Sequence, residues 1–198
     1  AVVQAAPAVL EAARAPPEVT FIHMAGNHDR SRNLKTVGAW EVFEAILRDK
    51  LPNLHLVSTP TIINEFAIFP WQWGRTALEQ VDDLKGAGAA SIAVGHWDLK
   101  AFDGKDDHMC PARALRDRFG TIPIYSGHFH KAGEYMVDGI PVICTGSMQP
   151  YAHGEGDMYV KVTSEEALTR QDLRDKCVKV RLKPGEEVPD IDCLSLTW

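Results

Sequence analysis

The stretch VTFIHMAGNHD, residues 19–29, joins an apolar run to a short polar turn. The run over 19–25 predicts a buried strand. Gly26 follows it, and glycine lets the backbone turn sharply and pass close to a neighbouring group. Asn27, His28 and Asp29 then bring an amide, an imidazole and a carboxylate together. The stretch therefore predicts a strand that ends at a chemical site.

The same pattern of strand, glycine and histidine occurs twice more, in AVGHWD (93–98) and YSGHFH (125–130). In open α/β sheets, ligands bind beyond the carboxyl ends of the strands, so we expect the three turns to converge. The site would then contain Asn27, His28, His96, His128 and His130, with Asp29 and Asp98 nearby. Imidazole and oxygen donors suit manganese, iron or zinc, so the sequence predicts a divalent metal site.

Strands and helices alternate along the whole chain, which predicts the α/β class. Further strands are expected at 54–58, 61–69, 91–94, 122–126, 140–146, 158–162 and 177–183. Helices are expected at 2–14, 40–47, 75–85 and 111–119. Asp138 and Gly139 predict a hairpin turn. His23, inside the first strand, is expected in the core, and His108 is expected in a solvated loop.

The composition is that of a globular protein: 198 residues, 45% hydrophobic and 24% charged. The net charge of -6 argues against a surface covered in positive charge but permits a local basic patch. No run of 18 apolar residues occurs, so no transmembrane helix is expected. The four cysteines form no C-x-x-C pair and are expected as free, mostly buried thiols in a reducing cytoplasm.

The three turns also carry a family resemblance. GNHD, GH and GHFH resemble the third, fourth and fifth motifs of the calcineurin-like metallophosphoesterases. Residues 94–102 and 127–157 are similar to the SbcD-type DNA repair nucleases, and above all to the small subunit of the recombination endonuclease of tailed phages. The likeness covers residues 15–165. It implies an α/β sandwich of two mixed sheets flanked by helices.

The resemblance implies roles for individual residues. Asn27, His96 and His128 would bind one metal ion, manganese in such nucleases, and His130 would bind a second. His28 would act as an acid toward the leaving oxygen, with Asp29 orienting it. Two ions about 3.5–4 Å apart activate water and neutralise phosphoryl oxygens, and a histidine of near-neutral pKa can supply the proton. The implied activity is exonuclease and endonuclease cleavage at DNA ends in recombination and repair.

The implied partners are DNA, an SbcC-type ATPase and a second copy of the chain, with no membrane. Arg30, Arg32 and Lys35 directly follow the first turn. They are either phosphate-backbone contacts or a solvated charged turn. Trp71 and Trp73 flank Gln72, and packing and base stacking are the two alternatives for these rings.

The chain departs from the family in one respect. The family's first two motifs, Asp-x-His and Gly-Asp-x-x-Asp, lie upstream of GNHD, and nothing in residues 1–20 resembles them. We therefore expect an N-terminally truncated metallophosphoesterase domain over 1–183, with 184–198 as a linker toward an absent capping domain. Whether this chain is active stays open. A small-substrate phosphodiesterase or phosphatase, and a non-catalytic scaffold that binds DNA or an ATPase, are the alternatives.

Overall fold

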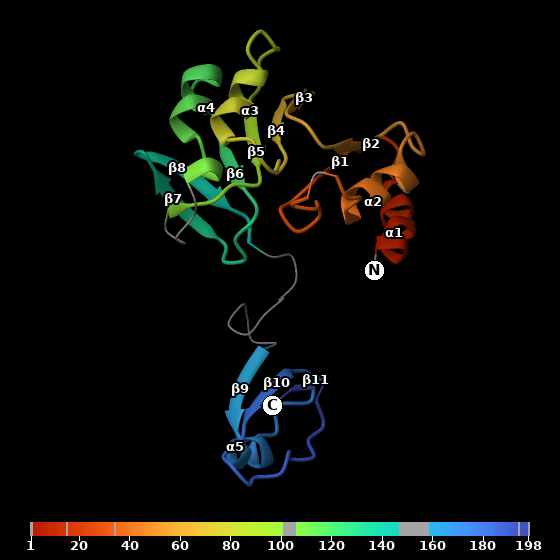
Figure 1. The fold of residues 1–198 in the computed structure, drawn as a ribbon, viewed down its shortest axis with the longest axis vertical. Coiled ribbons are helices and arrows are strands. Elements are labelled where there is room, and N and C mark those ends of the chain that lie inside the picture. Colours follow the sequence, from red (N-terminus) through yellow and green to blue (C-terminus); the bar gives the residue numbers. More distant parts are fainter. Residues whose placement is uncertain are drawn as a thin grey trace. The chain divides into compact units, whose positions relative to one another are not determined.

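Strands and helices alternate as the sequence predicted, and the chain is α/β (Figure 1). The computed structural model describes residues 2–14, 16–33, 35–100, 106–146, 159–193 and 195–197. The chain divides into two compact units, Ala1–Thr145 and Gly146–Trp198. This boundary differs from the expected one after residue 183, because the described residues beyond 158 form a hydrophobic core of their own.

A mixed sheet of six strands dominates the first unit, in the order β3-β4-β5-β6-β8-β7. Its strands are β3 (Thr61–Ile63), β4 (Phe66–Phe69), β5 (Ile92–Gly95), β6 (Ile124–Ser126), β7 (Gly133–Val137) and β8 (Ile140–Cys144). The four central strands run parallel, and β3 and β7 pair antiparallel at the two edges. The carboxyl ends of the parallel strands therefore meet at one edge of the sheet.

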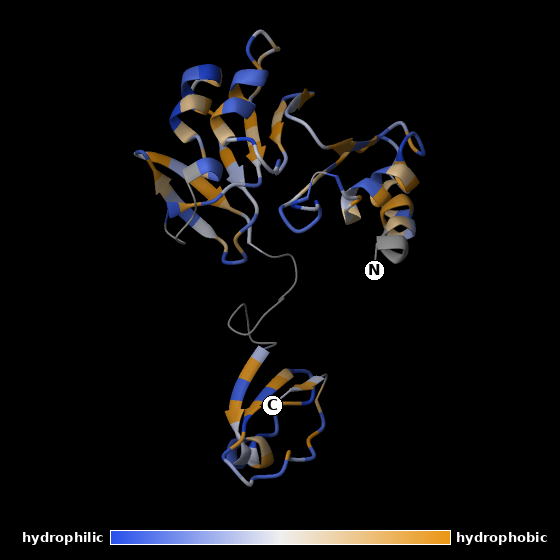
Figure 2. Ribbon diagram, viewed as in Figure 1, coloured by the Kyte–Doolittle hydropathy of each residue, from blue (hydrophilic) through white to orange (hydrophobic). Residues whose placement is uncertain are grey.

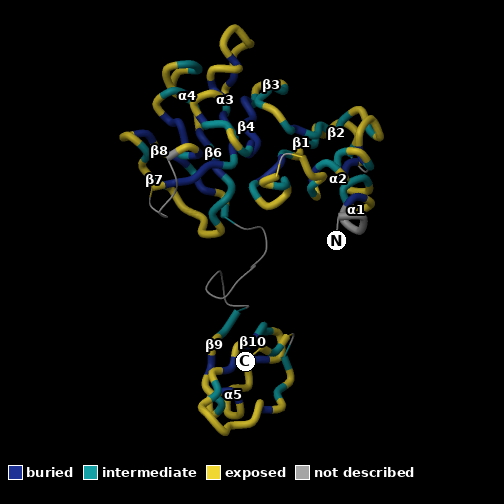
Figure 3. The backbone as a smooth tube through the Cα atoms, in the orientation of Figure 1, coloured by how far each residue is buried: buried dark blue, intermediate teal, exposed yellow. Residues whose placement is uncertain are grey.

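Two helices, α3 (Ala77–Asp83) and α4 (Ala112–Phe119), lie side by side next to this sheet (Figure 1). Apolar residues concentrate in β4, β5 and β6 (Figure 2), and this is where burial is deepest (Figure 3). The core includes Phe69, Trp97 and Leu115, each at most 2% exposed. Burial of such large side chains stabilises a fold by about 1.5–3 kcal/mol each, which holds the strand ends rigidly in place.

A smaller layer of the first unit has two parallel strands and two helices. The elements are α1 (Val2–Arg14), β1 (Phe21–Met24), α2 (Ala39–Leu47) and β2 (Leu54–Val57). Trp40 and Phe43 of α2 are buried in its core. The prediction that His23 is a core residue was wrong. His23 is exposed because, among the described strands, β1 pairs only with β2, although its ring lies 5.1 Å from that of Phe43.

Two turns show how local chemistry sets the strand boundaries. Residues 61–69, predicted as one strand, form the β3–β4 hairpin, and Asn64 at its turn has a φ of 53°. Asparagine tolerates this left-handed conformation better than most residues. The predicted turn at Asp138 and Gly139 is confirmed, since both have positive φ and connect β7 to β8. Strand β7 itself was not predicted.

The second unit has a parallel sheet in the order β11-β10-β9 and one helix. Its elements are β9 (Tyr159–Thr163), α5 (Ser164–Thr169), β10 (Cys177–Arg181) and β11 (Ser195–Thr197). Val178 and Val180 are 1% exposed in its core. Residues 195–197 were expected in a linker, but they pair with β10. Helix α5 was not predicted, although Thr163 and Glu166 form a capping box, which is a local sequence signal.

All four cysteines are free thiols, as predicted. Cys110 and Cys144 are buried, and Cys177 and Cys193 are half-buried. Burial raises the pKa of the Cys110 thiol to about 12, so this group is an inert part of the core. Among the described residues, no helix has the length and apolar character needed to cross a membrane.

Candidate metal centre

Three strand ends meet where the sequence places its glycine–histidine turns. β5 and β6 are parallel neighbours, and the N–H of Gly127 donates to the carbonyl of Gly95 over 2.9 Å. β1 belongs to the other layer of the first unit. The N–H of Trp71, just beyond β4, nevertheless donates to the carbonyl of Ala25 over 2.9 Å. These backbone bonds bring the ends of β1, β5 and β6 together.

Three donor atoms converge between these ends. Nε2 of His96 lies 2.9 Å from Oδ1 of Asn27 and 3.1 Å from Nδ1 of His128. Neighbouring ligands around an octahedral ion with bonds of about 2.1 Å are about 3 Å apart. The separations of 2.9 and 3.1 Å are compatible with that geometry and are also ordinary hydrogen-bond lengths. An amide oxygen and two imidazole nitrogens are also a donor set that suits manganese, iron or zinc.

Asp98 holds His128 from the opposite side of its ring. Its Oδ1 lies 2.7 Å from Nε2 of His128. An ionised carboxylate only accepts hydrogen bonds, so Nε2 carries the proton and Nδ1 turns its lone pair toward His96. Two backbone bonds fix Asp98 in turn: its N–H donates to the carbonyl of His108, and its carbonyl accepts from Cys110. The sequence had placed Asp98 only near the site.

Burial keeps both central imidazoles neutral. Burial, together with smaller effects of the nearby His128 and His28, lowers the pKa of His96 to about 3. Burial also lowers the pKa of His128; Asp98 opposes this effect, and His28 and His130 add to it. Neutral imidazoles are the form that binds metal ions. The same electrostatic interactions show that His28 and His130, which are both exposed, lie close to the central pair.

Glycine leaves room for the His96 ring at two of the strand ends. A Cβ on Gly26 would lie 2.9 Å from Cε1 of His96 and 3.1 Å from Oδ2 of Asp29. A Cβ on Gly127 would lie 3.3 Å from Nδ1 of His96. The strands therefore end on glycine so that the imidazole can pass between their turns.

His128 itself has a strained backbone. Its φ is 78°, a left-handed conformation that residues with a side chain adopt rarely. Such strain persists only where the surroundings determine the geometry, and it is often found at functional sites. Here the hydrogen bonds to His96 and Asp98 hold the ring from both sides. The backbone of His128 is thus adapted to aim its ring into the site.

The two residues predicted to act on the leaving group lie beside this centre. Oδ2 of Asp29 accepts a hydrogen bond of 2.8 Å from the N–H of Gly26, which closes the turn. The carbonyl of Asp29 accepts from the N–H of Trp40 at the start of α2. No hydrogen bond joins Asp29 to His28 within the described part of the chain. The predicted orientation of His28 by Asp29 stays a prediction.

The aromatic ring of Trp71 packs against both central imidazoles and against His108, and the sequence did not predict these contacts. Trp71 is 4% exposed, and its ring centroid lies 5.8 Å from that of His96 and 5.3 Å from that of His128. His108 stacks on Trp71 at 3.9 Å and is only 9% exposed, so the prediction of a solvated loop was wrong. The rings of Trp71 and Trp73 also contact each other, with centroids 5.2 Å apart.

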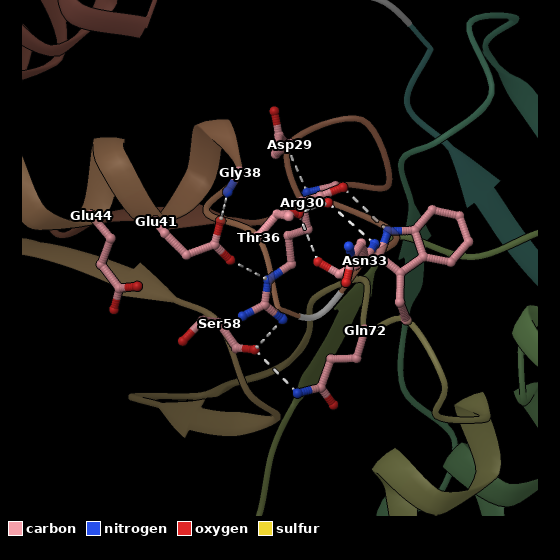
Figure 4. Close-up of polar contacts among 12 residues, drawn as sticks. Asp29, Arg30, Asn33, Thr36, Gly38, Glu41, Glu44, Ser58 and Gln72 are labelled. Carbon is pink, nitrogen blue, oxygen red and sulfur yellow. Dashed lines mark hydrogen bonds and ion pairs between the residues drawn. The ribbon is translucent and has the colours of Figure 1, made fainter.

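The three basic residues after the first turn differ in their surroundings. The Arg30 guanidinium donates to the carbonyl of Ser58 over 3.2 Å and lies 3.6 Å from a carboxylate oxygen of Glu41 (Figure 4). Arg32 and Lys35 are exposed, and neither forms an ion pair with any residue that the structure describes. Arg30 thus connects the end of β2 to α2, whereas the Arg32 guanidinium lies over the ring of Trp73 and Lys35 is exposed.

Within the described ranges, no group of three or more His, Cys, Asp or Glu side chains could hold a metal ion. The converging set has two imidazoles, and its third donor is the amide of Asn27. Residues 147–157, which carry part of the family resemblance, lie outside the described residues. The described donor set is therefore limited to two imidazole nitrogens and one amide oxygen.

In comparisons with known proteins, no family model, no curated protein and no solved structure matches the chain. A functional assignment therefore depends on the geometry of the site and on the motifs of the sequence.

Proposed function

We propose that this site binds a divalent metal ion, with manganese as the first candidate, and hydrolyses phosphodiester bonds. The proposal follows the resemblance to the calcineurin-like metallophosphoesterases, with their sandwich of two mixed sheets. The observation that carries it is the spacing of Nε2 of His96 from Oδ1 of Asn27 (2.9 Å) and from Nδ1 of His128 (3.1 Å). These atoms come from three separate strand ends, and folding alone does not require them to converge.

Each residue has a role in this proposal. Asn27, His96 and His128 hold one ion, and His130 belongs to the donor set of a second. Such ions supply charge neutralisation on the phosphoryl oxygens and a bound water of lowered pKa. His28 is the exposed imidazole that we assign to protonating the leaving oxygen. Asp29 remains the residue proposed to orient it.

The substrate in this proposal is DNA, cleaved at its ends in the cytoplasm during recombination or repair. Arg32 and Lys35 would contact phosphates of the backbone, and Arg30 would support the turn that carries them. Contacts of this kind bind without reading sequence and weaken steeply with salt. An SbcC-type ATPase and a second copy of the chain are the proposed protein partners, as in the SbcD-type nucleases.

A calorimetric titration with manganese tests the metal site directly. We expect the native chain to bind the ion and His128→Ala to lose that binding, with His55→Ala on β2 as the matched control. Hydrolysis of bis(p-nitrophenyl) phosphate and of linear duplex DNA then tests the reaction. Cleavage of the chromogenic ester without cleavage of DNA would favour a small-substrate phosphodiesterase. An absence of manganese binding in the native chain would refute the metal proposal.

A second candidate is a non-catalytic scaffold that binds DNA or an ATPase. One observation favours it: no described group has three or more of the usual His, Cys, Asp and Glu ligands. Two imidazoles and an amide bind ions more weakly than sets with carboxylates or thiolates. DNA binding that is unchanged by manganese, with no hydrolysis of either substrate, would identify the scaffold.

A further inference from the structure

A cavity of about 420 Å³ lies in the first unit beyond the turn that carries the candidate site. Its volume is within the range of roughly 300–1,000 Å³ that small-ligand sites occupy. The lining includes one aromatic residue, three cationic residues, one carboxylate and one amide: Trp73, Arg30, Lys35, Arg75, Glu41 and Gln72. Arg75 is paired with Asp83 and Arg30 with Glu41, so Lys35 is the cation of the lining that has no described ion pair. An aromatic wall beside such a cation is suited to a ligand that has both a negative charge and a flat ring.

One wall of this cavity is held firmly. The carbonyl of Ser58 accepts hydrogen bonds from Arg30 and from the side-chain nitrogen of Gln72, each 3.2 Å long (Figure 4). Oε1 of Gln72 is buried without a partner among the described residues. This oxygen is enclosed by protein atoms, so Gln72 holds the wall in place through its amide nitrogen and offers the cavity no acceptor at Oε1.

Trp73 supplies a flat surface in a fixed orientation. It is half-buried, and its indole N–H donates to the carbonyl of Arg30 over 3.3 Å. The Arg32 guanidinium lies over the ring, 5.0 Å from its centroid. Arg32 is not part of the cavity lining, so a base in the cavity would stack on the part of the Trp73 ring that lines it. Lys35 is exposed in the same cavity and can bind the adjoining phosphate.

The cavity adjoins the candidate metal centre through the aromatic wall. Trp73 contacts Trp71 at 5.2 Å, and Trp71 contacts the ring of His128 at 5.3 Å. Arg30, which lines the cavity, is only two residues beyond His28. A nucleotide in the cavity would therefore place the next phosphodiester of its strand toward His96 and His128.

We infer that this cavity binds the nucleotide next to the scissile phosphodiester, with its base stacked on Trp73 and its phosphate near Lys35. The inference rests on the proposed function and specifies its substrate. A stacking surface needs an exposed base face, which a duplex hides between its base pairs. The preferred substrate is therefore a single-stranded or frayed DNA end. Backbone contacts to intact duplex are the competing possibility.

Binding measured without metal ions tests the cavity separately from the metal centre. We would measure fluorescence anisotropy of a labelled octathymidylate in EDTA, with native protein, Trp73→Ala and Trp73→Phe. Loss of one stacked base, worth about 1–3 kcal/mol, should weaken binding about tenfold in Trp73→Ala. Trp73→Phe should retain most of the affinity. Phe119→Ala is the matched control, because Phe119 also has an arginine, Arg118, over its ring, at 4.7 Å.

Abasic oligonucleotides identify the stacked base. Removing the base that contacts Trp73 should weaken binding to native protein about tenfold and add little further loss in Trp73→Ala. Affinities within twofold of native in Trp73→Ala, or tighter binding of a blunt duplex than of the single strand, would overturn the inference. A manganese titration of native protein tests the metal centre alone. If the protein bound single-stranded DNA but no manganese, the proposed function would be refuted and the cavity would remain a nucleotide-binding site.

Discussion

The carboxylate of Asp98 lies 2.7 Å from Nε2 of His128, across 30 residues of sequence. It acts on the candidate centre without reaching it, because it fixes which ring nitrogen of His128 carries the proton. The opposite nitrogen, Nδ1, is the atom that faces His96. Carboxylates that hold a metal-binding histidine in this way commonly change metal affinity by about 10–100-fold.

Replacing Asp98 should therefore weaken manganese binding without removing a ligand. We expect Asp98→Ala to reduce the affinity by about 10–100-fold and Asp98→Asn to reduce it less, since the amide oxygen can still accept the hydrogen bond. Calorimetric titration of each variant measures this. Asp117→Asn, on the exposed side of α4, is the control for a lost carboxylate. If Asp98→Ala bound manganese as tightly as the native protein, Asp98 would not be needed to fix the tautomer of His128.

Gly26→Ala tests whether the first strand must end on glycine. The added Cβ would lie 2.9 Å from Cε1 of His96, closer than such atoms approach in real proteins, so the imidazole must shift. We expect a loss of about 1–3 kcal/mol in the free energy of unfolding, the usual effect of overpacking, and a tenfold or greater loss of manganese affinity. Urea denaturation and calorimetry measure the two effects.

Gly88→Ala is the matched control for this substitution. No atom lies within 4 Å of the position that its Cβ would occupy, so both quantities should stay close to native. If Gly26→Ala behaved like Gly88→Ala, the imidazole would have room that the structure does not show.

Stability should fall as the pH falls below about 6.5. The pKa of His96 is about 3 in the folded chain, below its ordinary value of 6.5, because the ring is buried. Between these values the unfolded chain takes up a proton that the folded chain does not, so acid favours unfolding. This one group should lower the free energy of unfolding by about 2 kcal/mol between pH 7.5 and 5. The lowered pKa of His128 acts in the same direction.

Urea denaturation at several pH values measures this loss. The variant His96→Gln has no imidazole at this position, so its stability should depend less on pH over the same interval. Equal slopes for His96→Gln and native protein would mean that other groups cause the acid sensitivity.

Arg118 should stabilise the packing of α4 against the end of α3. Its guanidinium donates to the carbonyls of Leu84, over 3.0 Å, and Ala87, over 2.5 Å. Hydrogen bonds from charged donors contribute about 1.5–3 kcal/mol each, so Arg118→Leu should destabilise the first unit by an amount of that order. Chemical denaturation measures the change. Arg113→Leu, exposed on the same helix, should stay within about 0.5 kcal/mol of native.

Local sequence was enough to identify the parts of the site but not their contacts. Short apolar runs that end in glycine predicted β1, β5 and β6, because strand formation and sharp turns depend on neighbouring residues. The same local logic predicted the turn at Asp138 and Gly139. It failed for residues 61–69, because the polar pair Asn64-Glu65 between two apolar runs does not by itself show that the backbone reverses there.

The sequence by itself determined the strand–helix alternation and the histidine-bearing strand ends, which depend on residues adjacent in the chain. Only the tertiary structure decided that Asn27 meets His96, 69 residues away, and that Asp98 rather than a closer residue holds His128. It also decided that His108 is buried against Trp71. These contacts depend on which strands become neighbours in the sheet, and that order is set by packing of the whole unit, since hydrophobic burial is not directional.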